Sequence, residues 1–256
     1  MADLKLDHIV HYVNDLDTSI RLFNEAGLAA SRGGSHTKWG THNALCYFGL
    51  FYVEFLGIER PEYAMNPKEP NLLVEDALKL LPAREIFGRI ALRTDNLDEV
   101  AASLSSKGAA LSPIKDGKRM NAQGQLIEWR MMMIEGNFNG LVYPFIIEWK
   151  GRDEDRFREM AEAGIIKPHP AGEVDFDSAI FEVSDPLATA DRWRELFGIP
   201  YEITANGDSA VLMLDGKPLM FIKGDKNNLS CVVFHTSTAS LKGTSMLVGE
   251  GEYVFK

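Results

Sequence analysis

The chain contains three copies of one sequence unit, and this repeat constrains the fold more than any other feature. The copies begin at Asp7 (DHIVHYVNDLDTSIRLFNEAGL), Gly88 (GRIALRTDNLDEVAASLSSKGA) and Ser178 (SAIFEVSDPLATADRWRELFGI). Each copy has the pattern of a short apolar strand, an acidic turn, an amphipathic helix and a glycine. Such a repeat predicts repeated structural units, and it lets equivalent positions be compared within one chain.

The predicted helix of each copy has a defined start and end. In the first copy Asn14 or Asp15 can cap the helix, and Leu16, Ile20 and Phe23 then share one face. A leucine precedes the closing glycine by eleven residues in every copy, as the pairs Leu16 and Gly27, Leu97 and Gly108, and Leu187 and Gly198. We expect the glycine to end each helix in a left-handed conformation.

Strand-rich sequence follows each predicted helix. The first helix is followed by ALCYFG and FYVEFLGI with LAASRGG as a weaker candidate, the second by ALSPIK, LIEWRMMMI and LVYPFIIEWKG, and the third by YEITA, SAVLMLD and PLMFIKG. The predicted unit is therefore βαβββ, recurring about every 80 to 90 residues. The run LSCVVFHT opens a fourth unit that lacks its helix, and the remaining sequence is too short to complete it. Residues 60–83 form a polar linker in which 78–81 could add a helical turn.

Composition narrows the class of partner. The chain has 27 Lys and Arg against 37 Asp and Glu, a net charge of −10, which disfavours nucleic acid because that partner requires a basic footprint. No apolar run approaches the roughly 18 residues that span a membrane, and no signal peptide is visible at the N-terminus. We therefore expect a cytoplasmic protein that binds neither nucleic acid nor a membrane. Cys46 and Cys231 lie in apolar strands and are expected to be buried free thiols.

The motifs of the first two units resemble those of a known group. A tandem βαβββ chain with a DHIV start and a YVEFLGI strand resembles the vicinal oxygen chelate superfamily, which includes glyoxalase I enzymes, extradiol dioxygenases, fosfomycin-resistance enzymes and bleomycin-binding proteins. The motifs GTHNALCYFG, YVEFLGI, LIEWRMMM, PFIIEWKG and KPHPAG are similar to those of its bacterial glyoxalase-like domain proteins. The resemblance covers about residues 5–223.

This resemblance implies an α+β fold in which tandem βαβββ modules form curved mixed sheets that enclose a cup. Residues 1–150 would hold the paired modules that form the cup, with module 1 at about 4–60 and module 2 at about 84–150. Residues 151–256 would hold the third module and the incomplete fourth. Cups in the superfamily form within one chain or between two, so both a monomer and a homodimer are consistent with the sequence.

The resemblance also implies where a metal would bind. Superfamily ligands come from the start of the first strand and the middle of the last strand of a unit, which here gives His8 and Glu54, then Arg89 and Glu148. The third unit has Ala179 in the place of His8, so the site is expected in the first two units. His8, Glu54 and Glu148 together would suit a divalent ion of Mn, Fe, Zn or Ni.

Arg89 departs from the superfamily pattern, because its metal enzymes commonly have a histidine there. A guanidinium does not ligate a metal. It could instead pair with Glu148 or bind a carboxylate or phosphate of the substrate. Arg130, if it faces inward, would strengthen such an anion pocket, although the strand period does not settle its direction.

The remaining candidates are histidines and aromatic residues. His42 is a candidate ligand or general base, and Glu148 is a second candidate for proton transfer. Tyr12 and Trp129, together with Trp39 and Phe145, could supply a surface on which a ligand stacks. Further histidines have simpler interpretations as loop, linker or core residues, namely His36, His169, His11 and His235.

Two functions are consistent with these residues. The first is a metal-dependent lyase, isomerase or dioxygenase that acts on a small oxygen-rich molecule in the cup. The second is a binding protein without turnover, similar to the drug-sequestering members of the superfamily, with an arginine-lined anion pocket. The sequence has no GxGxxG, GxxxxGK[ST], CxxC or GxSxG motif, so dinucleotide, phosphate-loop, dithiol and nucleophile-elbow chemistry is not indicated.

Overall fold

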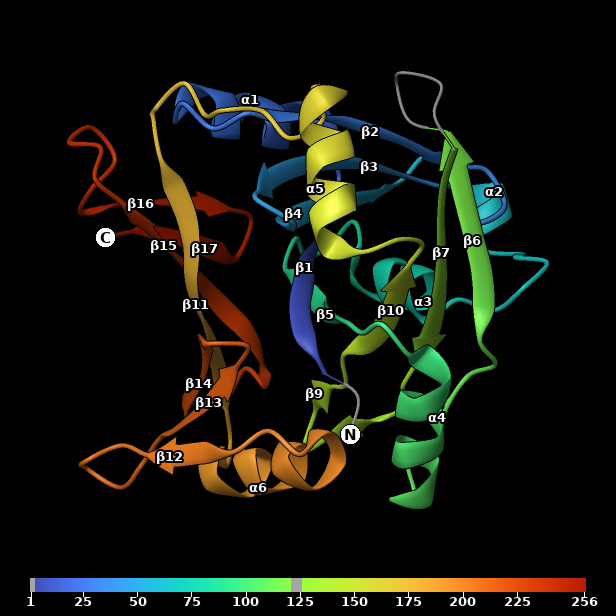
Figure 1. Cartoon of the computed structure of the whole chain (residues 1–256), viewed down its shortest axis with the longest axis vertical. Helices are drawn as coiled ribbons and strands as arrows, with labels where there is room; N and C mark the ends of the chain where they lie inside the picture. Colours follow the sequence, from blue (N-terminus) through green and yellow to red (C-terminus); the bar gives the residue numbers. More distant parts are fainter. Residues whose placement is uncertain (1–2, 121–125) are drawn as a thin grey trace.

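Two large β-sheets form the centre of the molecule in this computed structural model, which describes residues 3–120 and 126–256. One sheet has eight strands in the order β2-β3-β4-β1-β5-β10-β7-β6, and the other has seven in the order β12-β13-β14-β11-β15-β17-β16. Figure 1 shows the two sheets on opposite sides of the view, with the helices around them. The predicted α+β class with curved mixed sheets is confirmed.

The eight-stranded sheet joins the first two repeat units. Strand β1 pairs in parallel with β4 and antiparallel with β5, and β5 pairs in parallel with β10. Each unit therefore has its first strand at the centre of the sheet and its last strand beside it. The strands are β1 (Lys5–Tyr12), β2 (Ala30–His36), β3 (Thr41–Phe48), β4 (Phe51–Ile58), β5 (Phe87–Arg93), β6 (Lys115–Met120), β7 (Leu126–Met133) and β10 (Phe145–Trp149).

The seven-stranded sheet repeats this plan. Strand β11 is central, parallel to β14 and antiparallel to β15, and β15 is parallel to β17. The C-terminal segment thus supplies three strands of a fourth unit without a helix. The strands are β11 (Val174–Val183), β12 (Tyr201–Ile203), β13 (Ala210–Leu214), β14 (Lys217–Lys223), β15 (Asn228–Thr236), β16 (Thr244–Val248) and β17 (Gly251–Phe255), and a separate hairpin is made by β8 (Asn137–Phe138) and β9 (Leu141–Val142).

The three repeated helices begin and end as the sequence predicts. They are α1 (Leu16–Glu25), α4 (Leu97–Ser106) and α6 (Pro186–Phe197). Asp15 caps α1 by accepting a hydrogen bond from the backbone N–H of Asp17. The closing glycines have positive φ angles, namely Gly27 at 78°, Gly108 at 79° and Gly198 at 68°. This is the left-handed stop that glycine adopts without steric cost.

The structure differs from the sequence expectations in three places. The linker contains two helices, α2 (Pro61–Ala64) and α3 (Leu72–Leu80), where only a helical turn was expected. The predicted strand at 110–115 is mostly irregular, and β6 begins only at Lys115. The run 141–151 is interrupted between β9 and β10, where Pro144 has no N–H to donate to a strand partner. A further helix, α5 (Asp153–Glu162), connects the two halves and has no buried residue.

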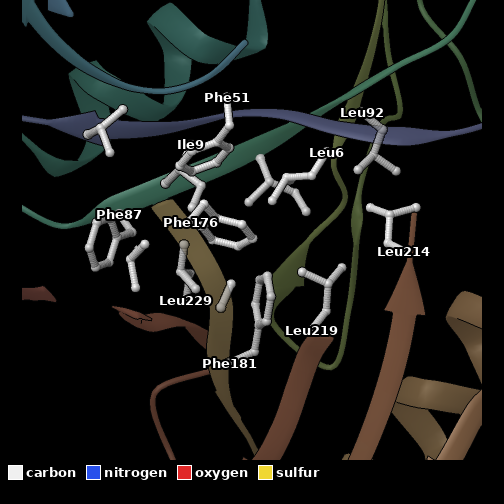
Figure 2. Close-up of a cluster of buried hydrophobic side chains, with 14 of the residues drawn as sticks. Leu6, Ile9, Phe51, Phe87, Leu92, Phe176, Phe181, Leu214, Leu219 and Leu229 are labelled. Atoms are coloured by element: carbon white, nitrogen blue, oxygen red, sulfur yellow. The ribbon is translucent and has the colours of Figure 1, made fainter. Parts of the chain in front are cut away.

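The main hydrophobic core fills the space between the two sheets. Figure 2 shows Phe51, Phe87 and Leu92 of the eight-stranded sheet facing Phe176 and Phe181 of the other sheet. Helices α1 and α4 pack into the same core through Phe23 and Leu104 among others. This face of the eight-stranded sheet is therefore closed by protein.

The opposite face of the eight-stranded sheet carries a second, smaller apolar cluster. It combines Val10 and Ala91 of the central strands with Leu73 and Ala77 of α3. Helix α3 therefore covers one end of this face and leaves the rest open. We call this concave, partly covered face the cup.

None of the described helices is long and apolar enough to cross a membrane.

Candidate functional site

The cup contains a small cavity that opens into a wider hollow. The inner cavity has a volume of about 70 Å³ and the outer hollow about 690 Å³, and both are lined by His36, Trp39 and Trp129. The inner walls are mostly apolar, with His8 and Glu54 among the few polar side chains. Apolar walls with a few converging polar groups are typical of small-molecule sites.

Strand alternation explains which side chains line the cavity. Successive residues of a strand face opposite sides of the sheet, so every second residue reaches the cup. The cavity is lined by Thr41, Asn43 and Leu45 of β3, by Tyr52, Glu54 and Leu56 of β4, by Trp129 and Met131 of β7, and by Phe145, Ile147 and Trp149 of β10. The residues between them face the core or the helices.

Asp7, His8 and Glu54 form a buried chain of ionisable groups that ends at the cavity. Asp7 Oδ1 lies 2.6 Å from His8 Nδ1, and His8 Nε2 lies 3.6 Å from Glu54 Oε2. The exposed fractions of Asp7, His8 and Glu54 are only 0%, 3% and 8%. Because a carboxylate accepts hydrogen bonds, the contact with Asp7 places a hydrogen on Nδ1 and directs Nε2 toward Glu54.

Asp7 reaches His8 through an irregularity in β1. The pairing of β1 with β5 shifts register between Leu6 and His8, which places Asp7 in a bulge. A bulge re-aims a side chain that regular alternation would direct to the other face. The second oxygen of Asp7 accepts a hydrogen bond of 2.9 Å from Trp149 Nε1. Both oxygens are thus used to hold side chains that line the cup.

Three neighbours fix the positions of His8 and Glu54. The ring of Tyr52 stacks on His8 with centroids 4.4 Å apart, and Phe145 meets the same imidazole edge-on at 5.3 Å. Asn43 Nδ2 donates a 2.6 Å hydrogen bond to Glu54 Oε1. A buried acid and a buried imidazole are therefore held at the cavity with few rotamers available.

Glu148 does not join His8 and Glu54. Its Oε2 accepts a hydrogen bond of 2.7 Å from the backbone N–H of Leu97 at the start of α4, and its Oε1 lies 3.3 Å from Arg130. In β10 the cup-facing residues are Phe145 and its alternates, so Glu148 faces α4 instead. Glu148 lines only the outer hollow.

Strand register identifies the true counterpart of Glu54. Val10 pairs with Glu54, and its repeat equivalent Ala91 pairs with Phe145. The second unit therefore presents a phenyl ring where the first presents a carboxylate.

The divalent metal that the resemblance implies needs at least three ligands, and the donor set does not fit. Of the three predicted ligands, His8 and Glu54 come together but Glu148 does not, because Phe145 occupies the symmetric position and has no donor atom. Among residues 3–120 and 126–256, no group of three or more His, Cys, Asp or Glu side chains is arranged to hold a metal ion.

Arg89 lies under α3, away from the inner cavity. It is 4% exposed, and its Nε donates a 2.7 Å hydrogen bond to Asp76 Oδ2. Its Nη1 donates to the carbonyl oxygens of Ile134 and Tyr143. The guanidinium therefore joins α3 to β5 and to the loop before β10.

His42 and Arg130 also lie apart from the pair. His42 alternates with the cup-facing Thr41 and Asn43, and its Nδ1 is 3.5 Å from Arg32 Nη1. Burial lowers the pKa of the His42 imidazole. Arg130 is held by Asp98 at 2.9 Å and by Glu148, where it lines only the outer hollow.

The aromatic candidates divide between two places. Trp129 and Trp39 stand where the inner cavity meets the outer hollow, and Phe145 lines the inner cavity. Tyr12 is fully buried and lines a different cavity beyond α3.

The other histidines take different positions. His36 lines the cavity with its Nδ1 3.1 Å from Thr41 Oγ1. His169 accepts a hydrogen bond from the backbone N–H of Ala29 and contacts Phe48. His11 is buried between the sheets, and His235 is exposed.

Three site residues were not indicated by the sequence. Asp7 is next to His8 and would face away from it in a regular strand, so only the bulge reveals its role. Asn43 and Trp149 could have been found from alternation, because each is two residues from a cup-facing position.

Comparisons with known proteins agree with this architecture. The sequence family described as the glyoxalase-like domain matches residues 6–197. No curated protein matches the chain. Among solved structures, a hypothetical protein from Staphylococcus aureus has a TM-score of 0.85 at 21% identity, with 99% of both chains covered.

Two further solved structures have known names. A variant of 4-hydroxymandelate synthase from Streptomyces coelicolor has a TM-score of 0.55 at 13% identity, covering 92% of this chain and 72% of that one. Methylmalonyl-CoA epimerase from Mycobacterium tuberculosis has a TM-score of 0.40 at 18% identity, covering 57% and 86%. At 13% identity the superposition on 4-hydroxymandelate synthase bears on the fold alone. Because the family match at residues 6–197 spans most of this chain, the chain belongs to the glyoxalase-like domain family of the vicinal oxygen chelate superfamily.

Proposed function

We propose that this protein is an enzyme that moves a proton on a small, oxygen-rich carbonyl compound held in the cup, with Glu54 and His8 as the acid–base pair. The reaction class is that of an isomerase or lyase, in which a C–H bond next to a carbonyl is broken and an enolate forms. The observation that carries the proposal is the buried chain Asp7–His8–Glu54 at the inner cavity.

The environment of Glu54 favours proton transfer. Its carboxylate is 8% exposed and lies among apolar side chains, so little water competes for it. Its Oε1 is held by Asn43, which leaves Oε2 on the side of His8. A proton taken by Oε2 can pass to His8 Nε2 after a small movement or through one water, since the atoms are 3.6 Å apart.

Asp7 supports the imidazole in this cycle. When His8 accepts a proton it becomes an imidazolium, and the carboxylate 2.6 Å from Nδ1 stabilises that charge. Trp149 holds Asp7 from the other side, so the carboxylate cannot turn away. Asp7 is thus a positioning residue for His8.

The two-part cavity indicates how a substrate would lie. The inner cavity of about 70 Å³ accommodates only a small reacting group. The outer hollow of about 690 Å³ offers Trp39 and Trp129 to the remainder of the molecule. Ring faces at the entrance favour a substrate whose distal part is planar or apolar.

A binding protein without turnover is the second candidate. Two buried polar atoms of cup residues, Trp39 Nε1 and Asn43 Oδ1, have no hydrogen-bond partner among the described residues. A bound molecule could supply these partners in either function. An anion pocket around Arg89 is not part of this candidate, because Nε and Nη1 of Arg89 already donate hydrogen bonds within the protein.

Solvent exchange separates the two candidates. The protein is incubated in D₂O with a panel of small 2-oxo acids, 2-hydroxy ketones and 1,3-dicarbonyl compounds, and loss of each C–H signal is followed by proton NMR. Enzyme-dependent exchange at the carbon next to the carbonyl is expected for at least one compound. Saturable binding of a panel member without exchange would support the binding protein. Absence of both exchange and binding across the panel would contradict both candidate functions.

Removal of metal is a second part of this test. Because His8 and Glu54 are two donors where a metal site needs three, we expect the exchange rate to survive dialysis against a chelator. Loss of exchange on dialysis, with recovery on adding one divalent ion, would show that the site recruits ligands beyond this pair.

A further inference from the structure

A second cavity lies on the far side of α3, where the two sheets meet. Its volume is about 240 Å³. One wall comes from the first half of the chain, including Tyr12, Phe87 and Gly88, and the other from the second half, including Phe181 and Trp193. Figure 2 shows Leu229 between Phe87 and Phe181 in the inter-sheet core. The acid–base pair of the cup is not among its lining residues.

Buried polar atoms without partners gather at this cavity. Tyr12 is 0% exposed and Trp193 is 1% exposed, yet the hydroxyl of Tyr12 and Nε1 of Trp193 have no hydrogen-bond partner among the described residues. The amide oxygen of Asn228, also on the lining, has none either. A buried polar group without a partner destabilises the folded protein, because it gives up its hydrogen bonds to water. Three such groups around one cavity therefore require an explanation.

The cup shows the same pattern. Six buried side-chain polar atoms of the described residues have no partner, and two of them, on Trp39 and Asn43, belong to residues that line the cup cavity. Three more, on Tyr12, Trp193 and Asn228, belong to the second cavity, and the sixth is on His11. Unpartnered polar groups thus concentrate at the two cavities, and the second has more of them than the candidate active site.

Backbone geometry adds to this picture of a built site. A Cβ atom on residue 88 would lie 2.3 Å from Cε2 of Tyr12, so only glycine lets the tyrosine ring stand against β5. The ring is thereby held between the apolar cluster of the cup and the second cavity.

The chemistry of the lining defines the ligand. The aromatic rings of Tyr12, Phe87, Phe181 and Trp193 favour a planar apolar body. Trp193 Nε1 is a donor and requires an acceptor, whereas the amide oxygen of Asn228 requires a donor. The volume is below the roughly 300–1,000 Å³ of drug-sized sites, which limits the body to one or two rings.

Charged groups at the lining favour an anion. Lys79, Arg84 and Lys226 line the cavity with one carboxylate, Asp76. Asp76 is already paired with Arg89, Arg84 with Glu250, and Lys226 with Glu182. Lys79, exposed in the last turn of α3, adds a cation to these balanced pairs.

We propose that the cavity between α3 and α6 is a second binding site, separate from the cup, for a small planar aromatic acid that carries a ring N–H. The carboxylate faces Lys79 and accepts from Trp193, and the ring N–H donates to Asn228. The site does not depend on the proton-transfer chemistry of the cup.

The four tryptophans allow both cavities to be observed in one experiment. Trp39, Trp129 and Trp149 line the cup, and Trp193 lines the second cavity. In ¹⁵N-labelled protein each indole N–H gives one resonance, which single Trp→Phe variants assign. Indole-3-acetate, which has the required ring, N–H and carboxylate, is the probe.

Titration with indole-3-acetate should shift the Trp193 resonance saturably while the three cup resonances move little. A dissociation constant on the order of 1 mM or tighter is expected for a ligand of this size. Asn228→Ala should weaken binding by about fivefold or more, as loss of one hydrogen bond does. Asn66→Ala, at an exposed asparagine away from both cavities, is the matched control and should bind as the unmodified protein does.

Three results would overturn the proposal. The first is that the Trp193 resonance shows no saturable shift up to the solubility limit of the probe. The second is that the cup resonances shift in its place. The third is that Asn228→Ala and Asn66→Ala weaken binding of the probe equally. Because solvent exchange reports on the cup alone, failure of the second site leaves the proposed proton transfer untouched, and the reverse also holds.

Discussion

At the residue scale, His8 and Glu54 reach the cup by ordinary strand alternation, whereas Asp7 reaches His8 through a bulge. Both oxygens of Asp7 accept a hydrogen bond, one from His8 Nδ1 and one from Trp149 Nε1. An asparagine has only one acceptor oxygen and cannot satisfy both donors. Replacement of Asp7 by asparagine therefore tests directly whether Asp7 orients His8.

Asp7→Asn is expected to slow solvent exchange by about tenfold to a hundredfold, which corresponds to the loss of one hydrogen bond to a charged group. The hydrogen on His8 should redistribute between Nδ1 and Nε2, because the asparagine amide can donate to Nδ1. The measurement is the exchange rate together with the ¹⁵N chemical shifts of the His8 ring. An unchanged tautomer with an unchanged rate would show that Asp7 does not position His8.

The sequence could indicate His8 and Glu54 but not their partners. Both lie where the superfamily pattern places polar residues, and the structure brings them together. The superfamily pattern aligns Glu148 with Glu54 as the middle residue of a unit's last strand, yet strand register aligns Glu54 with Phe145. Register depends on pairing with neighbouring strands, and an error of one residue reverses the face of every side chain.

At the element scale, α3 determines the depth of the cup. Its Leu73 and Ala77 pack on the cup face, and its Asp76 pairs with Arg89 of β5. This ion pair is buried, with side-chain exposures of 4% for Arg89 and 15% for Asp76. Arg89 therefore has a structural role that accounts for its charge without a substrate.

Arg89→Met should lower the free energy of unfolding by about 3 kcal/mol, because it leaves Asp76 buried without its partner. The double variant with Asp76→Leu should recover a large part of this loss, since no unpaired charge then remains. Urea unfolding measures the stability, and solvent exchange by the single variant should change little at temperatures where it is folded. If the variant instead loses affinity for the substrate while its stability is unchanged, Arg89 binds the substrate, as the sequence predicts.

Most elements follow from the repeat, and the exceptions have physical causes. The strands and capped helices carry their own periodicity, turn residues and glycine stops, so local sequence is sufficient. Helix α3 lies in a short linker segment, and Leu73, Val74 and Ala77 are buried only because the cup face is there to receive them. Its stability depends on tertiary packing, which local sequence does not show.

At the scale of the whole molecule, the two sheets enclose a histidine. His11 of β1 is 0% exposed, and its Nδ1 lies 2.6 Å from the hydroxyl of Tyr253 in β17. Burial of the ring lowers the pKa of His11 from 6.5 to about 3. The contact spans both halves of the chain, so protonation of His11 bears on the stability of their packing.

Acid should therefore destabilise the protein. Between pH 6.5 and about pH 3 the unfolded chain binds a proton at His11 that the folded chain does not, so stability falls as the pH falls through this window. At about 1.4 kcal/mol per pH unit, His11 alone accounts for a loss of up to about 5 kcal/mol.

The variant His11→Gln isolates this contribution. Urea unfolding at a series of pH values should give a flatter dependence for the variant than for the unmodified protein, whatever its absolute stability. Parallel curves across the window would mean that His11 titrates alike in the folded and unfolded states.

The central claim concerns the whole eight-stranded sheet, because its register decides which carboxylate enters the cup. Glu54 and Glu148 lie in the last strands of the two units and were both predicted to act there. Glu54 lines the inner cavity beside His8, whereas Glu148 caps α4 and reaches the outer hollow but not the inner cavity. The two residues are therefore a matched pair for one experiment.

The most direct measurement is the rate of solvent deuterium exchange for Glu54→Gln and Glu148→Gln on the compound that the unmodified protein exchanges fastest. Removal of the general base predicts a loss of about 10²- to 10⁴-fold for Glu54→Gln. Glu148→Gln should keep most of the rate, because among the described residues its carboxylate bonds to the α4 backbone and to Arg130, outside the inner cavity. Equal losses in the two variants, or a loss confined to Glu148→Gln, would contradict the assignment of the acid–base pair to the cup.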